Sequence, residues 1–214
     1  MHHRTPILAA ALVAVTAAAC HPHRVRTPVG MTLTAAAPAP LATLVWVGHG
    51  EASRRVGAGW QRAPEFDYDF TVEQRRYADH WDSVKTLRRS HPGYDGSAGP
   101  RVQVYLFHLD LAPGPAGGVT YRVTSTLGDG RGATDREFRE ASIELAADVS
   151  IFAPFDTYRI TQHYQYEVGR LSEDVSLDDG DAPWVRNHEE AWLFGPQSYP
   201  QPPTTVAAAS TLGR

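Results

Sequence analysis

Two histidines and an aspartate are the residues whose types and spacing come nearest to a metal site. His108 and Asp110 are two residues apart in an expected β-strand, so both side chains point to one face of the sheet. Imidazole and carboxylate groups in this arrangement can bind a metal ion such as zinc. His163, in another expected strand, would complete the site only if the two strands were neighbours. The alternative, which we favour, is a strand end where His108 packs against its neighbours and Asp110 begins a turn.

Other groupings that could support catalysis are incomplete. His188 is followed by Glu189 and Glu190 but lacks the second histidine that helical zinc-protease motifs require, so we interpret the three residues as a solvent-exposed strand start. The sequence contains no Gly-x-Ser-x-Gly nucleophile motif and no phosphate-binding Gly-x-x-x-x-Gly-Lys motif. We therefore expect a noncatalytic protein without a cofactor. A metal-assisted hydrolase that uses His108, Asp110 and His163 is a further alternative.

Aromatic residues are spread over the expected strands, with five tryptophans and nine tyrosines in the chain. Such side chains combine a large apolar surface with a polar tip, so they can line a cavity for an apolar ligand whose entrance is wet. The same residues also build ordinary sheet cores, which is the more frequent case. Our candidates for a cavity lining are Tyr158, Tyr164 and Tyr166, which share one face of an expected strand.

Alternation of apolar and polar residues dominates the central part of the chain, which is typical of half-buried antiparallel strands. We expect strands at 43–47, 66–72, 81–87, 101–111, 119–127, 158–168, 171–177 and 189–194. Residues 112–118 are rich in Pro and Gly and link two strands as a hairpin loop, and Gly169-Arg170 forms a tighter turn. The sequence therefore predicts a mainly β protein, either an antiparallel β-sandwich or a closed β-barrel of about seven or eight strands.

Two segments between these strands depart from the alternation. Gly128 to Gly132 contains three glycines together with Asp and Arg, and we predict a loop. In the segment from Thr134 to Val149, Thr134 is followed three residues later by Glu137, which resembles a capping box, and apolar residues recur with helical spacing. We predict one short helix there, although residues 142–145 fit a strand equally well.

The N-terminal segment has the organisation of an export signal. Met1 to Arg4 is short and basic, Ile7 to Ala19 is uncharged, and the only cysteine, Cys20, follows three alanines. Such a run is too short to span a bilayer but fits the apolar region of a signal peptide. These residues resemble the lipobox of bacterial lipoprotein signal peptides. The resemblance implies cleavage after Ala19, a thioether from Cys20 to diacylglycerol and acylation of the new amino terminus.

The resemblance covers residues 1–20 only, and residues 42–195 do not suggest a family to us. It implies an exported protein held to the cell envelope by its lipid. Because His21 and not Asp follows the cysteine, we expect the outer membrane, with the domain facing the periplasm. The alternative is an ordinary secretory signal that leaves a free thiol on Cys20.

Composition divides the chain into four segments. We expect a signal peptide at 1–19, a lipidated disordered tether at 20–41, a β-rich domain at 42–195 and a disordered Pro/Ala-rich tail at 196–214. With 24 acidic and 20 basic residues and a net charge of −4, the chain does not resemble a nucleic-acid binder. Lys85 is the only lysine, which we ascribe to GC-rich codon usage.

These observations leave three functional classes. We expect an envelope lipoprotein with a noncatalytic domain that binds a partner, such as another envelope protein. The alternative is a carrier of lipid or another hydrophobic molecule in an aromatic-lined barrel, which would require a cavity of about a few hundred cubic ångströms. The metal-assisted hydrolase is the third.

Overall fold

The computed structural model describes residues 39–148, 150, 154–180 and 182–194. The predicted signal peptide, Cys20, the predicted tail and all but the last residues of the predicted tether lie outside the described residues. The elements are β1 (Ala42–Val56), β2 (Gly59–Arg62), η1 (Pro64–Phe66), β3 (Tyr68–Arg76), β4 (His80–Arg88), β5 (Val102–Pro113), η2 (Pro115–Gly117), β6 (Val119–Ser125), β7 (Gly128–Thr134), β8 (Glu140–Ala147), β9 (Thr157–Gln165), β10 (Arg170–Asp179) and β11 (Ala182–Leu193).

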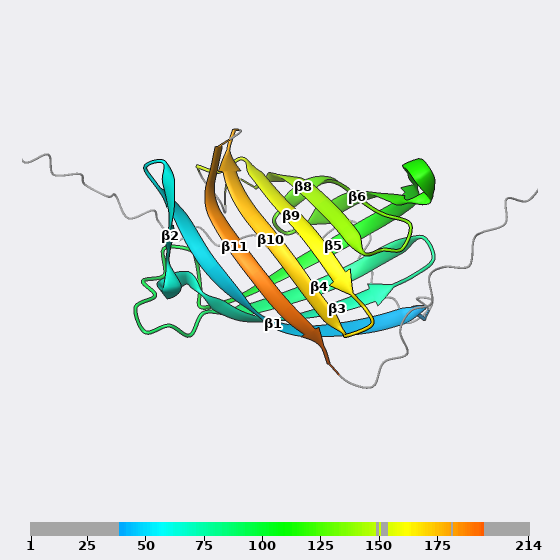
Figure 1. Cartoon of the computed structure of the whole chain (residues 1–214), viewed down its shortest axis with the longest axis horizontal. Helices are drawn as coiled ribbons and strands as arrows, with labels where there is room; N and C mark the ends of the chain where they lie inside the picture. The colour runs from blue at the N-terminus through cyan, green and yellow to red at the C-terminus, as the bar shows by residue number, and fades with distance from the viewer. Residues whose placement is uncertain (1–38, 149, 151–153, 181, 195–214) are drawn as a thin grey trace, which may run out of the picture.

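These strands form one antiparallel sheet that closes on itself (Figure 1). From β3 to β11 each strand pairs with the next along the chain, and β1 pairs with both β3 and β11. β2 is a hairpin partner of the last part of β1, so it extends from the rim of the barrel. The mainly β prediction is confirmed, with the barrel formed and not the sandwich. The described strands number eleven, ten of them in the closed barrel, which exceeds the seven or eight expected.

Alternation along each strand decides which side chains face inward. On β4, for example, Trp81, Ser83, Lys85 and Leu87 are buried while the residues between them are only partly covered. The inward side chains pack into two clusters, one around Trp81 and Leu145 and the other around Trp46. Burial of each large apolar side chain contributes about 1.5–3 kcal/mol to folding.

The predicted loop at 128–132 and the predicted helix within 134–149 are instead the two strands of a β-hairpin, β7 and β8. Both predictions are therefore wrong. In β7 the glycines allow close approach of the neighbouring strand, since a Cβ on Gly130 would overlap the carbonyl oxygen of Glu144. In β8 the buried residues alternate, with Ile143 and Leu145 facing inward. Burial against the barrel interior therefore overrides the helical spacing of this segment, and the strand alternative for residues 142–145 is the one observed.

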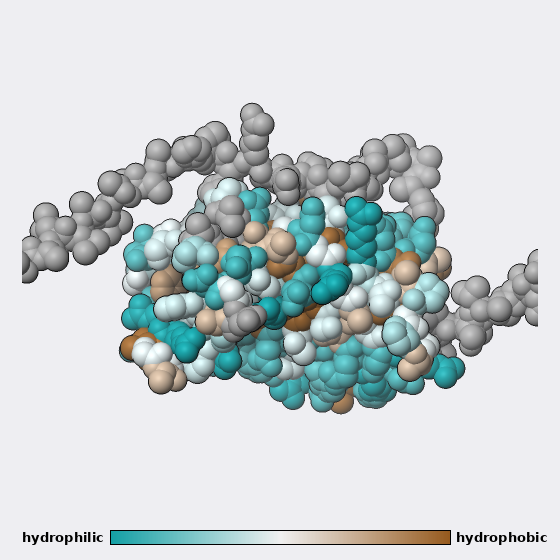
Figure 2. All heavy atoms as spheres, turned by 90° about the horizontal axis from the view of Figure 1, so that it is seen from above, coloured by the Kyte–Doolittle hydropathy of each residue, from teal (hydrophilic) through white to brown (hydrophobic). Residues whose placement is uncertain are grey.

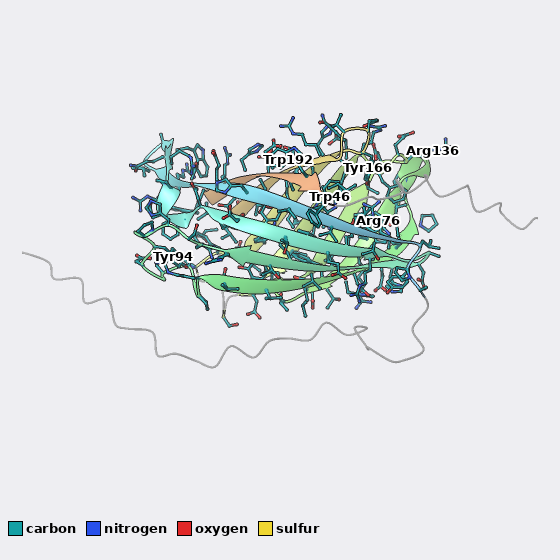
Figure 3. All side chains as sticks on the ribbon, turned by 90° about the horizontal axis from the view of Figure 1, so that it is seen from below. Trp46, Arg76, Tyr94, Arg136, Tyr166 and Trp192 are labelled. Carbon is teal, nitrogen blue, oxygen red and sulfur yellow. The ribbon has the colours of Figure 1, made fainter. Side chains whose placement is uncertain are left out.

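The barrel has two ends, which we name by their place in the chain. At the N-terminal end, where β1 begins, lie the connections at 77–79, 114–118, 135–139 and 166–169. The opposite end carries the β1–β2 hairpin and the connection from Arg89 to Arg101. Figure 3 shows Tyr94 at this opposite end and Arg76, Tyr166 and Arg136 at the N-terminal end. The outer face in Figure 2 is mainly hydrophilic, with scattered apolar residues.

Candidate binding site inside the barrel

A buried ion cluster lies inside the barrel. Nζ of Lys85 on β4 lies 2.7 Å from Oε1 and 2.6 Å from Oε2 of Glu189 on β11, and 3.0 Å from Oε1 of Glu173 on β10. Lys85 and Glu173 are each 6% exposed, and Glu189 is 1% exposed. A buried charge is costly unless it is paired and hydrogen-bonded, and the three charged groups of this cluster pair with one another. The cluster links β4 to two strands that are not its neighbours in the sheet.

Tyr68 and Gln162 complete the hydrogen bonding of the two carboxylates. The Tyr68 hydroxyl donates to Glu189 Oε1 at 2.5 Å, and Gln162 Nε2 donates to Glu173 Oε2 at 2.6 Å. Gly50 lies opposite Tyr68 on β1 and makes room for its ring, since a Cβ on Gly50 would lie 2.5 Å from Tyr68 Cζ. This glycine therefore helps to place the Tyr68 hydroxyl against Glu189.

Burial and the neighbouring charges set the protonation of the cluster. Burial opposes a charge on Lys85, but Glu173 and Glu189 outweigh it, so the pKa of Lys85 is raised. Burial raises the pKa of Glu189 to about 7; Lys85 opposes this shift and Glu173 adds to it. Burial, with the Glu189 charge, also raises the pKa of Tyr68 well above its ordinary value. At neutral pH Lys85 is thus an ammonium, Tyr68 a neutral donor, and Glu189 lies between its two protonation states.

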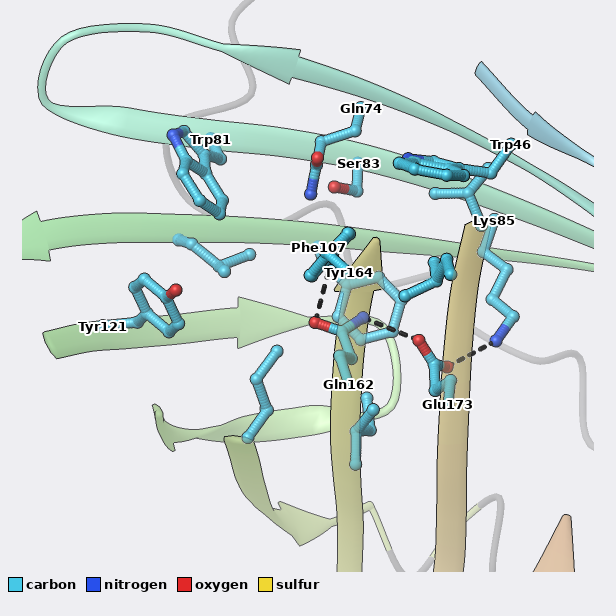
Figure 4. A pocket seen from close by; sticks show the side chains of 15 residues that line it. Trp46, Gln74, Trp81, Ser83, Lys85, Phe107, Tyr121, Gln162, Tyr164 and Glu173 are labelled. Atoms are coloured by element: carbon cyan, nitrogen blue, oxygen red, sulfur yellow. Dashed lines mark hydrogen bonds and ion pairs between the residues drawn. The ribbon is translucent and has the colours of Figure 1, made fainter. Parts of the chain in front are cut away.

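A cavity lies next to the ion cluster (Figure 4). Its wall is mostly apolar, with Lys85, Glu173, Gln162 and Tyr164 on the polar side. The cavity volume is about 50 Å³. At about 10–15 Å³ for each water, this is enough for roughly three to five water molecules. Drug-sized ligand sites have about 300–1,000 Å³. In this conformation the cavity suits a small molecule and not a lipid.

Three polar side chains from adjacent strands also line the cavity: Trp46 on β1, Gln74 on β3 and Ser83 on β4. Gln74 lies directly opposite Ser83, and Trp46 lies opposite Val72, the neighbouring inward residue of β3. Within the described part of the chain, the buried Trp46 Nε1 has no hydrogen-bond partner. A buried donor left in this state costs about 1–3 kcal/mol. A polar occupant of the cavity would remove that cost.

Aromatic and cationic side chains close the barrel at its N-terminal end. The Arg76 guanidinium lies 4.3 Å from the ring centre of Trp81, and its Nη2 donates to the Tyr166 hydroxyl at 3.0 Å. That hydroxyl in turn donates to the carbonyl oxygen of Phe138 at 3.0 Å. Phe138 has a φ of 56°, in the left-handed region that bulky residues rarely adopt. Its ring packs on Trp81, with centroids 5.4 Å apart. The strained turn therefore places two packed aromatic side chains at this end of the barrel.

Tyr94 and Arg89 cover part of the opposite end. Tyr94 is 6% exposed, and its hydroxyl donates to the carbonyl oxygen of Gly99 at 2.7 Å. The Arg89 guanidinium lies 5.3 Å from the ring centre of Tyr94 and 5.6 Å from that of Tyr68.

The tyrosines predicted as a cavity lining have different places in the barrel. Tyr158 and Tyr164 are buried and inward-facing, and Tyr166 is half-buried. Tyr164 lines the cavity, and its hydroxyl donates to Gln162 Oε1 at 3.2 Å. Tyr166 stacks on Tyr164 and belongs to the closure of the N-terminal end. Tyr158 packs in the other core cluster, so of the three only Tyr164 lines the cavity.

The three residues of the predicted metal alternative are not brought together. His108 and Asp110 lie on the outer face of β5, where His108 Nε2 is 3.1 Å from Asp110 Oδ1 and His108 Nδ1 is 2.7 Å from Asp82 Oδ1. His163 lies beside Glu140 on β9, which is separated from β5 in the sheet by β6, β7 and β8. In the described ranges, no group of three or more His, Cys, Asp and Glu residues is arranged to hold a metal ion.

The interpretation of residues 188–190 as a solvated strand start is wrong, because they lie inside β11, which begins at Ala182, and Glu189 is buried. Alternation along β11 turns Glu189 inward while His188 and Glu190 face outward, where His188 contacts Asp174. The ion cluster was not predicted, although the sequence carries a signal for it. Lys85 follows Trp81 and Ser83 at alternate positions, which assigns the only lysine of the chain to an inward face.

Comparisons with known proteins do not assign this chain to a family. No family model matches it, and no curated protein matches it. Among solved structures, an N-terminal dehydratase from the difficidin assembly line is 10% identical, with a TM-score of 0.25 over 70% of this chain and 78% of the other. A likeness at this level carries no argument about function. The described helical segments include none with the length and apolar character of a membrane span.

Proposed function

We propose that this protein is an envelope lipoprotein whose barrel binds a small organic molecule in its interior cavity without transforming it. The lipid on Cys20 supplies the attachment to the membrane, and the outer membrane facing the periplasm is the proposed location. The barrel supplies the binding site. The proposal combines two of the expectations from the sequence. The protein is a noncatalytic envelope lipoprotein, and its barrel holds a hydrophobic ligand that is smaller than a lipid.

The observation that carries the proposal is the unpartnered Trp46 Nε1 beside a mostly apolar cavity. Folded proteins rarely leave a buried N–H group without a partner. Ligand sites commonly combine an apolar wall with a few placed polar groups, which is the composition found here. A bound molecule with one polar group would satisfy the tryptophan and fill the apolar part.

The ion cluster supports a binding role more than a catalytic one. A lysine nucleophile must be an uncharged amine, whereas the carboxylates keep Lys85 charged and occupy its hydrogen atoms. Glu173 is likewise engaged by Lys85 and Gln162. Glu189, whose pKa is about 7, does not line the cavity. The cluster therefore stabilises the wall of the cavity.

Contact with another envelope protein is the second candidate. Four apolar side chains at the N-terminal end are exposed, namely Leu41, Val168, Trp192 and Phe194. Leu41 directly precedes β1, Phe194 N–H donates to Val45 O, and Trp192 lies opposite Val47, so these side chains lie along the first half of β1. This candidate and ligand binding are compatible.

Native mass spectrometry on the full protein, purified in mild detergent from membranes, tests the proposed function. The native host is the source, so that an endogenous ligand has the chance to bind. We expect a reproducible small-molecule adduct that is lost in the Ser83→Leu variant, because a leucine would fill the cavity. Ser53→Leu, on the outer part of β1, is the matched control and retains the adduct. Absence of any adduct, or an adduct that survives Ser83→Leu, would contradict the proposal.

A further inference from the structure

The polar groups of the cavity point to the chemistry of its ligand. We propose that the ligand is a compact, neutral, mostly apolar molecule whose carbonyl-type oxygen accepts hydrogen bonds from Trp46 Nε1 and from the Ser83 and Gln74 side chains. This inference rests on the proposed function, because it concerns the same cavity.

The three donors come from neighbouring positions of three consecutive strands in the sheet. Gln74 and Ser83 form a direct cross-strand pair, and Trp46 lies diagonally from Gln74 across β1 and β3. Side chains in such positions are within about 4.5–8 Å of each other at Cβ, so they can reach one ligand atom. Figure 4 shows the nitrogen side of the Trp46 ring directed toward Ser83. The donors thus converge on one side of the cavity.

The amide and carboxylate oxygens that line the cavity accept hydrogen bonds from protein donors, whereas the Tyr121 hydroxyl in the same wall has no partner among the described residues. Gln74 Oε1 accepts from Arg76 Nε at 2.8 Å, and Gln162 Oε1 accepts from the Tyr164 hydroxyl at 3.2 Å. Both oxygens of Glu173 accept, one from Lys85 and the other from Gln162. The groups left for an occupant are the Trp46 and Gln74 N–H groups and the Ser83 and Tyr121 hydroxyls. The hydroxyls can donate or accept, but the N–H groups only donate, so the ligand atom that suits all of them is an acceptor.

Charge excludes an anionic ligand. Glu173 and Glu189 share a single ammonium, Lys85, whose contacts they occupy. A ligand carboxylate in the adjacent cavity would add a negative group beside Glu173 without adding a cation, in an interior that screens charge poorly. A ligand cation would in turn face the N–H groups of Trp46 and Gln74. A neutral oxygen, such as that of a ketone or lactone, fits both conditions.

Most of the remaining wall is apolar and favours an apolar ligand body. Val72, Phe107, Ile143, Ile160 and Leu171 line it, and none of these side chains offers a hydrogen bond. Each buried CH2 group of a ligand contributes about 0.8 kcal/mol there. The small volume limits the ligand to a compact shape in this closed conformation.

Two probes of the same shape test this inference: cyclohexanone, which has a carbonyl oxygen, and methylenecyclohexane, in which a CH2 group replaces it. Both are titrated into the 15N-labelled chain from His21 to Arg214, and the indole N–H signals are followed by NMR, with Trp46 assigned through the Trp46→Phe variant. We expect the ketone to bind about threefold to tenfold more tightly, which is the worth of one net hydrogen bond, and to shift the Trp46 signal downfield.

The variants separate the hydrogen bond from the shape of the cavity. Trp46→Phe keeps an aromatic ring and removes the N–H, so the ketone should lose its advantage while methylenecyclohexane still binds. Ser83→Ala is a second, less disruptive variant and should reduce the advantage in part. Equal affinities in the unmodified chain with an unmoved Trp46 signal would overturn the inference and leave the proposed function standing. Failure of both probes, together with the absence of a native adduct, would overturn the proposed function itself.

Discussion

Lys85 Nζ lies 2.6 Å from Glu189 Oε2 in the interior of the barrel, where Glu189 is only 1% exposed. This contact joins β4 to β11, which are separated in the sheet by β3 and β1. With Glu173, it places the only lysine of the chain between two buried carboxylates. The contact therefore links the stability of the barrel to the polar wall of the cavity.

Replacing Lys85 by methionine should destabilise the barrel strongly. Met has a similar length but no charge, so Glu173 and Glu189 would lose their common cation while remaining buried. Breaking a buried pair in this way costs about 3–5 kcal/mol. Equilibrium urea unfolding measures the change in the free energy of unfolding. Arg170→Met, which removes an exposed ion pair with Glu190, is the control and should cost about 1 kcal/mol or less. Equal effects of the two variants would contradict the structural role given to Lys85.

The free energy of unfolding should fall as the pH rises from about 4.5 toward 7 because of Glu189. Its pKa is raised from 4.5 to about 7 in the folded protein, so over this range the folded state keeps a proton that the unfolded chain has lost. The extra proton on Glu189 therefore contributes roughly 3 kcal/mol to the free energy of unfolding below pH 4.5. This contribution is lost as the pH rises to about 7. Urea unfolding at several pH values measures it.

Glu189→Gln should remove this pH dependence, since an amide does not titrate. Glu190→Gln is the matched control one residue away on the outer face. The hydrogen bond from Arg170 lowers the pKa of Glu190, so its titration lies below this pH window. The Glu190 variant should therefore keep the slope between pH 4.5 and about 6, below the range in which loss of its contact with His188 changes the titration of that histidine. A slope unchanged in Glu189→Gln would show that Glu189 does not titrate there.

Closure of the barrel between β1 and β11 should depend on Gly48. A Cβ at this position would lie 2.7 Å from both Ala191 Cβ and Phe70 Cζ, so Gly48→Ala forces the seam apart. Overpacking of this kind costs about 1–3 kcal/mol. Gly59→Ala on β2 is the control, because its nearest contact would be Val56 O at 3.9 Å. Thermal unfolding of both variants should show a lower Tm for Gly48→Ala only; a lower Tm for both, or for neither, would argue against this seam.

The lipid anchor can be tested with a reagent that labels amines. If the amino terminus is acylated on Cys20, Lys85 is the only amine of the mature protein, and it is buried. The native protein, purified from membranes in mild detergent, should take up no label, and the unfolded protein one. Cys20→Ser, which cannot be lipidated, should retain a free amino terminus and take up one label when native. Mass spectrometry that finds a labelled terminus in the unmodified native protein would contradict acylation.

The alternation of residues was sufficient to predict the sheet but not its closure or its full strand count. Strands such as β3 and β9 have clear period-two patterns. β7 does not, because its glycines serve close strand contact and resemble a loop in sequence. The helical spacing in β8 was local, and burial of Ile143 and Leu145 against the interior decided against it. Such effects depend on long-range packing, which no local pattern contains.

The candidate site was only partly predictable for a related reason. The inward direction of Tyr164 follows from alternation alone. The pairing of Lys85 with Glu173 and Glu189 depends on closure of the sheet, which brings β4 to face β10 and β11. The unpartnered Trp46 Nε1 is likewise a property of the packed interior. A charged residue in the inward phase of a strand is the one sequence signal that would have directed attention to the barrel interior.

A crystal structure of the protein purified from its own membrane tests the central claim most directly, since it would reveal what occupies the cavity. The account predicts density for a small organic molecule, with an oxygen atom about 3 Å from Trp46 Nε1. Density for ordered water alone, hydrogen-bonded to Trp46 Nε1 and Ser83, would contradict it, because water would then satisfy the donors without a ligand.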